Sequence, residues 1–535
     1  MRILVAIIFL FFYSWTLNAQ NSTSTFPPSN WFNEDPVLDS LNGVSTTRAY
    51  EFLKGRKSKT VLVAIIDSGI DINHEDLKDK IWTNKDEIPG NGVDDDHNGY
   101  VDDVHGWNFI GGKDGTNVGP DTYEVTREYK RLKPKFEGVK KSRKHEFEYW
   151  QEIDKSFHDT YAKSNNQYHF YDSLKTAISR YNQLLTAYLN VDKLTPDEVA
   201  KVNSPDQEIK FASTFMANIL QMVGEADIKN ILNQLDDAVD HFKKQVDYGY
   251  NLDLDTRKIV GDHPNQLNEV GYGNNDVIGK GTDHFHGTHV AGIIAADREN
   301  NIGIKGIANN VLIMPVRTVP DGDERDKDVA NAIRYAVDNG AQIINMSFGK
   351  AYSPHKEYVD KAVEYAKSKN VLLVHAAGNA GEDTDDANNF PNRQLLNKKT
   401  VDNWIEVGAS SWGEGKRLAA SFSNYGKNSV DVFAPGVKIY STAPDNEYRD
   451  AQGTSMASPV TAGVAALLLS YFPNLTPKDI REIIIESSRK FEGLMVIKPG
   501  TKDEQTDFSN LSVSGGIVNA YTAVRLADAR LLKKK

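Results

Sequence analysis

The chain has 535 residues, of which 39% are hydrophobic and 10% aromatic, so it can bury large cores and is not a disordered protein. Its 74 acidic and 62 basic residues leave a net charge of -12, which argues against a nucleic-acid partner, because phosphate binding needs a concentrated basic face. The chain has no cysteine, which excludes disulfides, a thiol nucleophile, cysteine-based zinc sites and a lipid anchor on cysteine.

The first 19 residues have the pattern of a secretory signal peptide. Arg2 precedes the apolar run ILVAIIFLFFY, and Ala19 is a small residue suited to a cleavage site. The run is too short for a membrane span, and no later stretch approaches the roughly 20 apolar residues that a transmembrane helix needs. The sequence predicts a secreted or periplasmic protein without stable membrane insertion, in which residues 20–58 form an N-terminal extension.

Two regions, 59–118 and 275–535, alternate apolar runs of strand length with helical patterns. Apolar side chains at helical spacing fill 329–337 and 359–366. This alternation is typical of a parallel sheet covered by helices. It predicts an α/β fold with a doubly wound, mostly parallel sheet, whose clearest strands are 60–67, 311–317, 342–349, 371–379 and 404–410.

The region between them, residues 119–274, has a different texture. It is long and charged, and it holds no strand-like run of comparable strength. Tyr171, Leu174 and Ile178 recur at steps of three and four residues, and TPDE from Thr195 has the pattern of a helix N-terminal capping box. We interpret this region as an all-helical subdomain inserted between two parts of the sheet domain.

The segment DDDHNGYVDD, residues 94–103, has the spacing of an oxygen-ligand loop. Asp94, Asp96 and Asn98 alternate, a glycine follows that allows a sharp turn, and Asp102 continues the pattern. The segment resembles a calcium loop, although His105 stands where the closing Glu is expected. Two interpretations stay open: a structural Ca²⁺ site, and an acidic turn without metal.

Four polar residues stand where a predicted strand ends or a helix begins: Asp67, His286, Asn379 and Ser455. Each has an ordinary interpretation when taken alone. An Asp after a strand commonly caps a turn, and a Ser before a helix commonly caps the helix. In a doubly wound sheet, however, catalytic groups gather at the carboxyl ends of the strands.

Together these residues supply the groups that an activated hydroxyl requires. A neutral imidazole takes the serine proton, and a buried carboxylate fixes the imidazole tautomer. The Asn379 amide, with the Ser455 backbone N–H at a helix start, is suited to stabilise the negative charge that forms on an attacked carbonyl oxygen. This chemistry requires no cofactor.

Five segments, in order, resemble the signature segments of the subtilisin-like serine peptidases. They are IIDSGID with HEDL just after it, HGTHVAG, INMSFG, AAGN and GTSMASP. The order Asp, His, Ser is also the subtilisin order among the convergent serine triads.

The resemblance implies a subtilisin-like fold and a serine endopeptidase that acts on proteins or peptides. It makes Asp67 the orienting carboxylate, His286 the general base and acid, Ser455 the nucleophile and Asn379 the oxyanion donor. It also implies a substrate edge.

In that edge Ser347, Phe348 and Gly349 pair with the peptide backbone. Together with Ala377 and Gly378 they form the walls around the residue before the cut.

Two alternatives remain at this point. One is a binding protein on a peptidase scaffold, because fold does not fix function. The other is an enzyme that transfers the acyl group to an amine instead of water. In addition, the acidic stretch AGEDTDDANN after Asn379 fits either a preference for basic substrate side chains or a solvated loop.

Overall fold

The computed structural model describes residues 27–141, 145–223, 228–279 and 283–534. The chain divides into two compact units: a sheet unit, Phe26–Glu124 with Leu254–Lys535, and a helical unit that includes Val125–Asp253. The helical unit lies inside the predicted insertion 119–274, whose two ends belong to the sheet unit. The predicted signal peptide, residues 1–19, lies outside the described residues.

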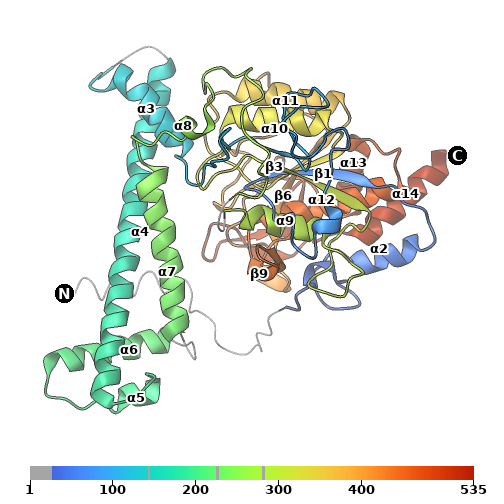
Figure 1. Ribbon diagram of the computed structural model, residues 1–535. Coiled ribbons are helices and arrows are strands. Elements are labelled where there is room, and N and C mark those ends of the chain that lie inside the picture. The colour runs from blue at the N-terminus through green and yellow to red at the C-terminus, as the bar shows by residue number, and fades with distance from the viewer. Residues whose placement is uncertain (1–26, 142–144, 224–227, 280–282, 535) are drawn as a thin grey trace. The chain divides into compact units, whose positions relative to one another are not determined.

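A nine-stranded sheet with the order β10-β13-β7-β6-β5-β4-β1-β3-β2 forms the centre of the sheet unit (Figure 1). Every adjacent pair is parallel except β10 with β13. The predicted α/β fold with a mostly parallel sheet is confirmed. The strands are β1 (Val61–Asp67), β2 (Trp107–Asn108), β3 (Val311–Arg317), β4 (Ile343–Met346), β5 (Leu372–Ala376), β6 (Trp404–Ser410), β7 (Val432–Pro435), β10 (Arg489–Lys490) and β13 (Gly516–Ile517).

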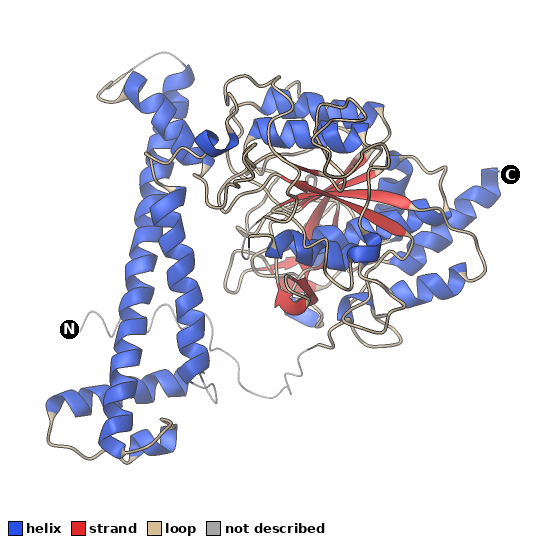
Figure 2. Cartoon of the chain, in the orientation of Figure 1, coloured by secondary structure: helices blue, strands red, loops and turns tan. Residues whose placement is uncertain are grey.

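Helices cover both faces of this sheet, which Figure 2 shows as red strands between blue helices. Successive residues of β1 belong to different cores: Val63 and Ile65 to one cluster, Ala64 and Ile66 to the other. The first cluster is completed by α2 (Thr46–Leu53), α9 (Phe285–Ala295), α12 (Thr454–Tyr471), α13 (Pro477–Ser487) and α14 (Ala520–Lys534). The second is completed by α10 (Asp326–Asp338) and α11 (Lys356–Ser368).

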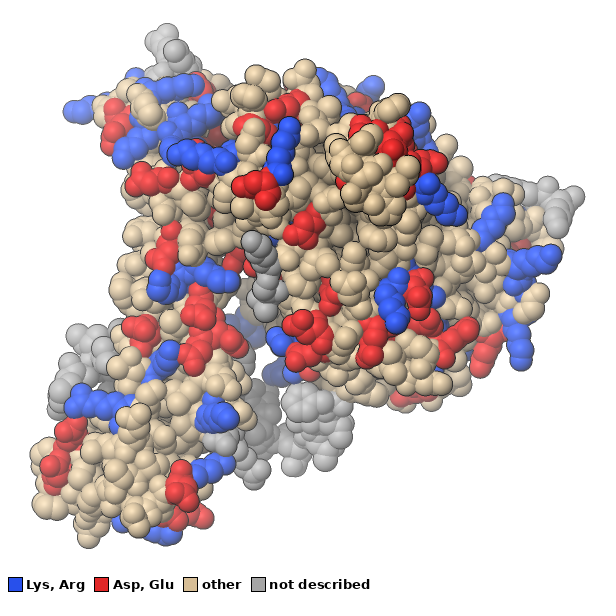
Figure 3. Space-filling model, in the orientation of Figure 1, with Lys and Arg blue, Asp and Glu red and all other residues tan. Residues whose placement is uncertain are grey.

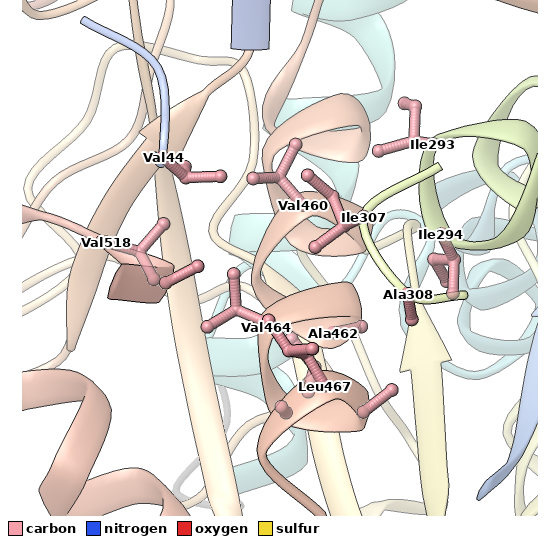
Figure 4. Packing of buried hydrophobic residues seen from close by; sticks show 14 of the residues in the cluster. Val44, Ile293, Ile294, Ile307, Ala308, Val460, Ala462, Val464, Leu467 and Val518 are labelled. Carbon is pink, nitrogen blue, oxygen red and sulfur yellow. The ribbon is translucent and has the colours of Figure 1, made fainter. Parts of the chain in front are cut away.

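Helix α12 is buried along most of its length. Figure 4 shows Val460, Val464 and Leu467 of this helix among apolar side chains from other segments. Of the helices in the described ranges, α12 alone is long and apolar enough to cross a membrane by length and composition. Since 89% of that stretch is buried inside the protein, α12 is a core helix here.

The described part of the N-terminal extension, residues 27–58, packs into the sheet unit. Trp31 and Phe32 are fully buried in the first core cluster, and α2 lies in the same segment. Two small antiparallel hairpins complete the unit: β8 (Ile439–Ala443) with β9 (Glu447–Ala451), and β11 (Met495–Ile497) with β12 (Gln505–Asp507).

The helical unit holds two long helices that pack along each other, α4 (His145–Leu189) and α7 (Ile228–Lys244). The predicted periodic residues Leu174 and Ile178 lie in its buried core, with Met216 of α6. Thr195 accepts a hydrogen bond from the N–H of Glu198, as the predicted cap requires. Its other helices are α3 (Glu124–Phe136, whose first residue belongs to the sheet unit), α5 (Pro196–Ala200), α6 (Gln207–Val223) and a π-helical turn (Gln245–Gly249).

Acidic and basic side chains are interspersed on the face seen in Figure 3. The lysine-rich segment around α3 is also mixed in sign. Lys135 lies 2.9 Å and Arg131 3.2 Å from the carboxylate of Glu146, and Arg131 also pairs with Glu128. Glu128 is buried, but the pairs with Glu146 are exposed, which is the pattern of a solvated surface.

Candidate active site

Asp67 and His286 lie side by side although they belong to different elements. Asp67 is the last residue of β1, and His286 is the second residue of α9. His286 Nδ1 donates a hydrogen bond of 2.7 Å to Asp67 Oδ1, and the Asp67 side chain is only 2% exposed. The next residue is Gly287, and a Cβ there would lie 2.2 Å from the carbonyl oxygen of Gly69. The close approach of α9 to the turn after β1 therefore requires glycine at this position.

The pair determines the protonation of the imidazole. Burial alone would lower the pKa of His286, but the charge of Asp67 and its hydrogen bond outweigh burial and raise this pKa above the ordinary value. Nδ1 is the protonated nitrogen, because it faces a carboxylate. Nε2 is thereby left as the basic nitrogen of the neutral ring.

Ser455 is the second residue of α12, and its hydroxyl donates to the carbonyl oxygen of Ser347 at 3.0 Å. Among the described residues, the Ser455 hydroxyl therefore bonds to Ser347 and not to His286. Ser347 in turn donates its hydroxyl to the Ser455 carbonyl at 2.9 Å. That carbonyl is available because Pro459, four residues later in α12, has no N–H to donate to it.

Two buried residues extend this link between β4 and α12. Asn345, in β4, donates to the Ser347 hydroxyl at 3.0 Å and accepts from the Ser458 hydroxyl at 2.8 Å. Both Asn345 and Ser458 are fully buried. A satisfied buried network of this kind fixes one arrangement, so the start of α12 is held against the end of β4.

Asn379 is oriented by the start of the same helix. Its Oδ1 accepts from the backbone N–H of Thr454 at 2.9 Å and from the Thr454 hydroxyl at 3.0 Å. The amide oxygen is therefore occupied and the amide nitrogen is the end left to donate. It faces Gly453, where an added Cβ would lie 3.4 Å from Nδ2. The arrangement suits an oxyanion donor beside Ser455.

The predicted substrate edge lies directly beyond two neighbouring strands. β4 ends at Met346, before Ser347, Phe348 and Gly349, and β5 ends at Ala376, before Ala377 and Gly378. Since β4 and β5 pair in parallel, both segments leave the sheet at the same edge. Ser347 and Ala377 are buried, whereas Phe348 is half-buried.

Two asparagines that sequence reasoning missed support these segments. Asn389 donates to the carbonyl oxygens of Ala376 and Ala377 at 3.1 and 2.9 Å. Its Oδ1 lies 2.4 Å from where a Cβ on Gly349 would be, so Asn389 lies against both segments. Asn424 donates to Ala377 at 2.8 Å. Neither asparagine stands in a recognisable motif, and only the fold brings them to this edge.

Two other histidines near these strands have structural partners. His375, in β5, is fully buried and donates from Nδ1 to Glu406 at 2.9 Å, so it is a core histidine. His289 lies in α9, where its Nε2 is 3.1 and 3.0 Å from the carbonyl oxygens of Ile439 and Arg449. Burial lowers the pKa of His289 to about 4, so this ring is neutral.

The acidic loop is arranged differently from the predicted ligand set. The Asp94 carboxylate accepts from the N–H groups of Asn98 and Gly99, and the Asp102 carboxylate accepts from those of residues 90, 91 and 92. Asp96 instead joins Glu87 and Asp103, with one ligand oxygen from each within 4.8 Å of the others.

This three-carboxylate cluster fits a cation. Glu87 is 6% exposed, and its Oε2 is buried without a hydrogen-bond partner among the described residues. Burial, supported by the neighbouring Asp96 and Asp95, raises the pKa of Glu87. Burial also raises the pKa of Asp103 to about 6. A bound cation would favour the ionised form of these carboxyl groups, and Ca²⁺ prefers carboxylate oxygens as ligands.

The profile of the subtilase family matches residues 58–515, which span both segments of the sheet unit and the helical unit between them. The chain belongs to the subtilase family of serine-type endopeptidases. Membership of this family explains both the fold of the sheet unit and the order of the five signature segments along the chain.

Curated relatives agree with the family match. This subtilase is 44% identical over 209 residues to the thermophilic serine proteinase of Bacillus sp. (strain AK1), which covers 39% of this chain and 48% of the relative. It is 38% identical over 241 residues to thermitase of Thermoactinomyces vulgaris, and the match covers 45% of this chain and 75% of thermitase. It is 38% identical over 200 residues to subtilisin DY of Bacillus licheniformis, and the match covers 37% of this chain and 67% of subtilisin DY. The chain thus spans about half the length of the first of these relatives.

Proposed function

We propose that this subtilase hydrolyses peptide bonds in proteins or peptides through an acyl-enzyme on Ser455. The observation that carries the proposal is the 2.7 Å hydrogen bond between His286 and the buried Asp67 in a chain of this family. In this mechanism His286 Nε2 takes the proton of Ser455 and returns it to the leaving amine. Asp67 holds the imidazole in one tautomer and stabilises the imidazolium.

The Ser455 hydroxyl has to leave its bond to Ser347 before it can react. A neutral hydrogen bond of this type contributes only about 1 kcal/mol, so rotation of one side chain is a small cost. In serine enzymes without substrate the hydrogen bond between nucleophile and base is often long, and it tightens when substrate binds. The resting position of Ser455 is compatible with the role of nucleophile.

The tetrahedral intermediate carries negative charge on the former carbonyl oxygen. We assign its stabilisation to the Asn379 amide and to the backbone N–H of Ser455, which as the second residue of α12 has no acceptor within the helix. Thr454 fixes the Asn379 side chain through two hydrogen bonds, so the donor needs no reorganisation during the reaction. This preorganisation is the usual source of oxyanion stabilisation.

The substrate is proposed to bind as an extended strand along Ser347, Phe348 and Gly349. The walls around the residue before the cut are then Phe348 and Gly349 on one side and Ala377 and Gly378 on the other. Support comes from the position of both segments beyond the carboxyl ends of β4 and β5. Strand addition would supply backbone hydrogen bonds, and the walls would supply side-chain preference.

A structural Ca²⁺ ion is proposed at Glu87, Asp96 and Asp103, the carboxylates that converge. The ion would neutralise buried negative charge in the loop, and it takes no part in peptide hydrolysis. Secretion or periplasmic export is proposed from the pattern of residues 1–19.

The proposal is tested with the purified protein on a casein digest and on short peptides. Hydrolysis by the wild-type protein that is lost in Ser455→Ala and in His286→Ala, with unchanged melting temperatures, is the expected result. Equal hydrolysis by wild type and Ser455→Ala would refute the assignment of the nucleophile. Addition of an amine nucleophile distinguishes hydrolysis from acyl transfer, since only the latter would give the amide as the main product.

A further inference from the structure

Lys350 directly follows the predicted substrate edge, and its charged end is buried. The side chain is 2% exposed. Its Nζ donates to Glu124 Oε2 at 2.7 Å, pairs with Asp326 at 2.8 Å and donates to the carbonyl oxygen of Glu324 at 2.8 Å. A buried ammonium group is tolerated only with such partners, so the position of Lys350 depends on these three groups.

The backbone of Lys350 connects the two walls around the proposed substrate pocket. Its N–H donates to the Phe390 carbonyl at 3.0 Å, and the N–H of Phe390 donates back at 2.8 Å. The residue before Phe390 is Asn389, which bonds the carbonyl oxygens of Ala376 and Ala377. A shift of Lys350 would therefore reach Gly349 on one wall and Asn389 behind the other.

Glu124 connects Lys350 to the root of the helical insertion. It is the first residue of α3 and the last residue of the sheet unit before the helical unit begins. Its backbone N–H donates to Asp323 at 2.8 Å, so Glu124 is held through both its side chain and its backbone. Within the helical unit, Thr126 bonds the carbonyl oxygen of Gly249 at 2.7 Å, which ties the incoming and outgoing ends of the insertion together.

We propose that Lys350 is a positioning residue of the substrate pocket and that its ion pair with Glu124 makes the shape of the pocket depend on the first turn of α3. The inference rests on the proposed peptidase function. A change that displaces Glu124 would therefore change which side chain the pocket accepts before the cut. The arrangement of Asp67, His286 and Ser455 would stay unchanged.

The test compares full-length wild type with Glu124→Gln on peptides that differ only in the residue before the cut. Glu124→Gln keeps the size of the side chain but removes its charge. We expect kcat/KM to change by on the order of tenfold, mainly through KM and unequally among side chains, because small misplacements of a binding wall are amplified in the rate. The rate of labelling by a small fluorophosphonate should stay at the wild-type value.

Asp121→Asn is the matched control. Asp121 lies in the same segment before α3, and its ion pair with Arg325 at 3.1 Å involves neither Lys350 nor a residue of the pocket walls. We expect this variant to lower the melting temperature without changing the order of preference among the peptides. An equal change of preference in both variants would mean that general loosening, not the Lys350 ion pair, is responsible, and the proposal would be wrong.

A second pair of variants keeps the test decisive. Lys350→Gln should shift the preference in the same direction as Glu124→Gln and at least as far, because it also removes the ion pair with Asp326. The double variant should shift the preference no further than Lys350→Gln alone, because Lys350→Gln already removes the ion pair with Glu124. If Lys350→Gln does not fold, Lys350→Arg, which keeps the charge, should retain the wild-type order. An active wild type whose order of preference is unchanged in Glu124→Gln overturns this inference alone, whereas a wild type that neither cleaves nor labels overturns the proposed function.

Discussion

The Asp67 carboxylate accepts a hydrogen bond from His286 Nδ1 at 2.7 Å, although the two residues come from β1 and α9 and are separated in sequence by the whole helical unit. Asp67→Asn keeps the shape of this contact but presents an amide to Nδ1. We expect kcat to fall by about 10⁴-fold with the fold intact, because the imidazole then favours the wrong tautomer. Initial rates on a peptide substrate and the melting temperature check this, and a loss below tenfold would contradict the role of Asp67.

The same pair predicts the pH dependence of activity. Protonated His286 cannot accept the Ser455 proton, so kcat/KM should rise with pH through a pKa above the ordinary value of a histidine. In Asp67→Asn, the residual activity should titrate at lower pH, because the carboxylate that raises the pKa is gone. A pH–rate profile of kcat/KM for both proteins measures this, and identical midpoints would contradict it.

Stability should depend on pH in a matching way. The pKa of His286 is higher in the folded than in the unfolded protein. The stabilisation from its pair with Asp67 is therefore fully present below the unfolded pKa, about 6.5, and is lost as pH rises through the folded pKa. The difference in melting temperature between wild type and Asp67→Asn should shrink over this range, and a difference that grows with pH would reverse the assignment.

The oxyanion assignment predicts a loss confined to the chemical step. Asn379→Leu removes the amide donor at similar size, and we expect kcat to fall by about 10²- to 10³-fold with little change in KM. Thr454→Val is the graded comparison. It removes one of two bonds to Asn379 Oδ1 and leaves the backbone N–H of Thr454, so its effect should be smaller. An equal increase of KM in both variants would contradict the assignment.

Gly287 is predicted to be essential for the alignment of α9 with β1. A Cβ at this position would lie 2.2 Å from the Gly69 carbonyl oxygen and 3.2 Å from the Asp67 Cβ, so Gly287→Ala must displace the helix. We expect kcat/KM to fall on the order of 10²-fold, since a shift of about 1 Å at reacting groups has this effect. Gly413→Ala is the control, because a Cβ there meets nothing within 4 Å, and it should retain full activity.

Calcium should raise the melting temperature, and a chelator should lower it. At a free concentration of 100 times Kd, a site specific to the folded state adds about 2.7 kcal/mol. Glu87→Gln should abolish most of this dependence. Asp94→Asn should retain it, because the Asp94 carboxylate is engaged by backbone N–H groups of the loop. A midpoint that calcium does not change in the wild-type protein would refute the site.

Much of the fold could be predicted from the sequence because its central strands are buried on both faces. β1 and β3 are apolar up to their last residue, β6 is apolar or small except for Glu406 and its last residue, and α10 and α11 show a clear helical period. The outer strands could not be predicted in this way. β2, β10 and β13 have two residues each, which is too short for any period, and they form only where the rest of the sheet offers an edge.

Part of the candidate site could be predicted from the sequence. The motifs indicated Asp67 and His286, which the structure brings together, whereas their catalytic roles, like those of Ser455 and Asn379, stay predictions. The supporting contacts were out of reach, because residues such as Asn345 and Asn389 have no pattern of their own and act through elements that meet only after folding. One signal was available: the proline four residues after Ser455 frees the Ser455 carbonyl, which Ser347 then binds.

The acidic loop shows the limit of spacing as a guide. The alternate residues Asp94, Asp96, Asn98 and Asp102 were the predicted ligands. In the structure Asp96 is the one predicted carboxylate in the converging cluster, and the Asn98 amide donates to Asp96 and Asp103 at 3.0 and 3.1 Å. Asp102 instead accepts backbone N–H groups of the turn at residues 90–92, so its neighbour Asp103 lies in the cluster. Which carboxylates converge depends on how this turn folds back.

The central claim, that Ser455 is an activated nucleophile, is tested most directly by labelling the purified protein with a fluorophosphonate and locating the modified peptide by mass spectrometry. The account predicts labelling at Ser455 alone, with a rate that rises with pH in step with deprotonation of His286 and disappears in Ser455→Ala. A folded wild-type protein that stays unlabelled, or that is labelled equally well in Ser455→Ala, would contradict it.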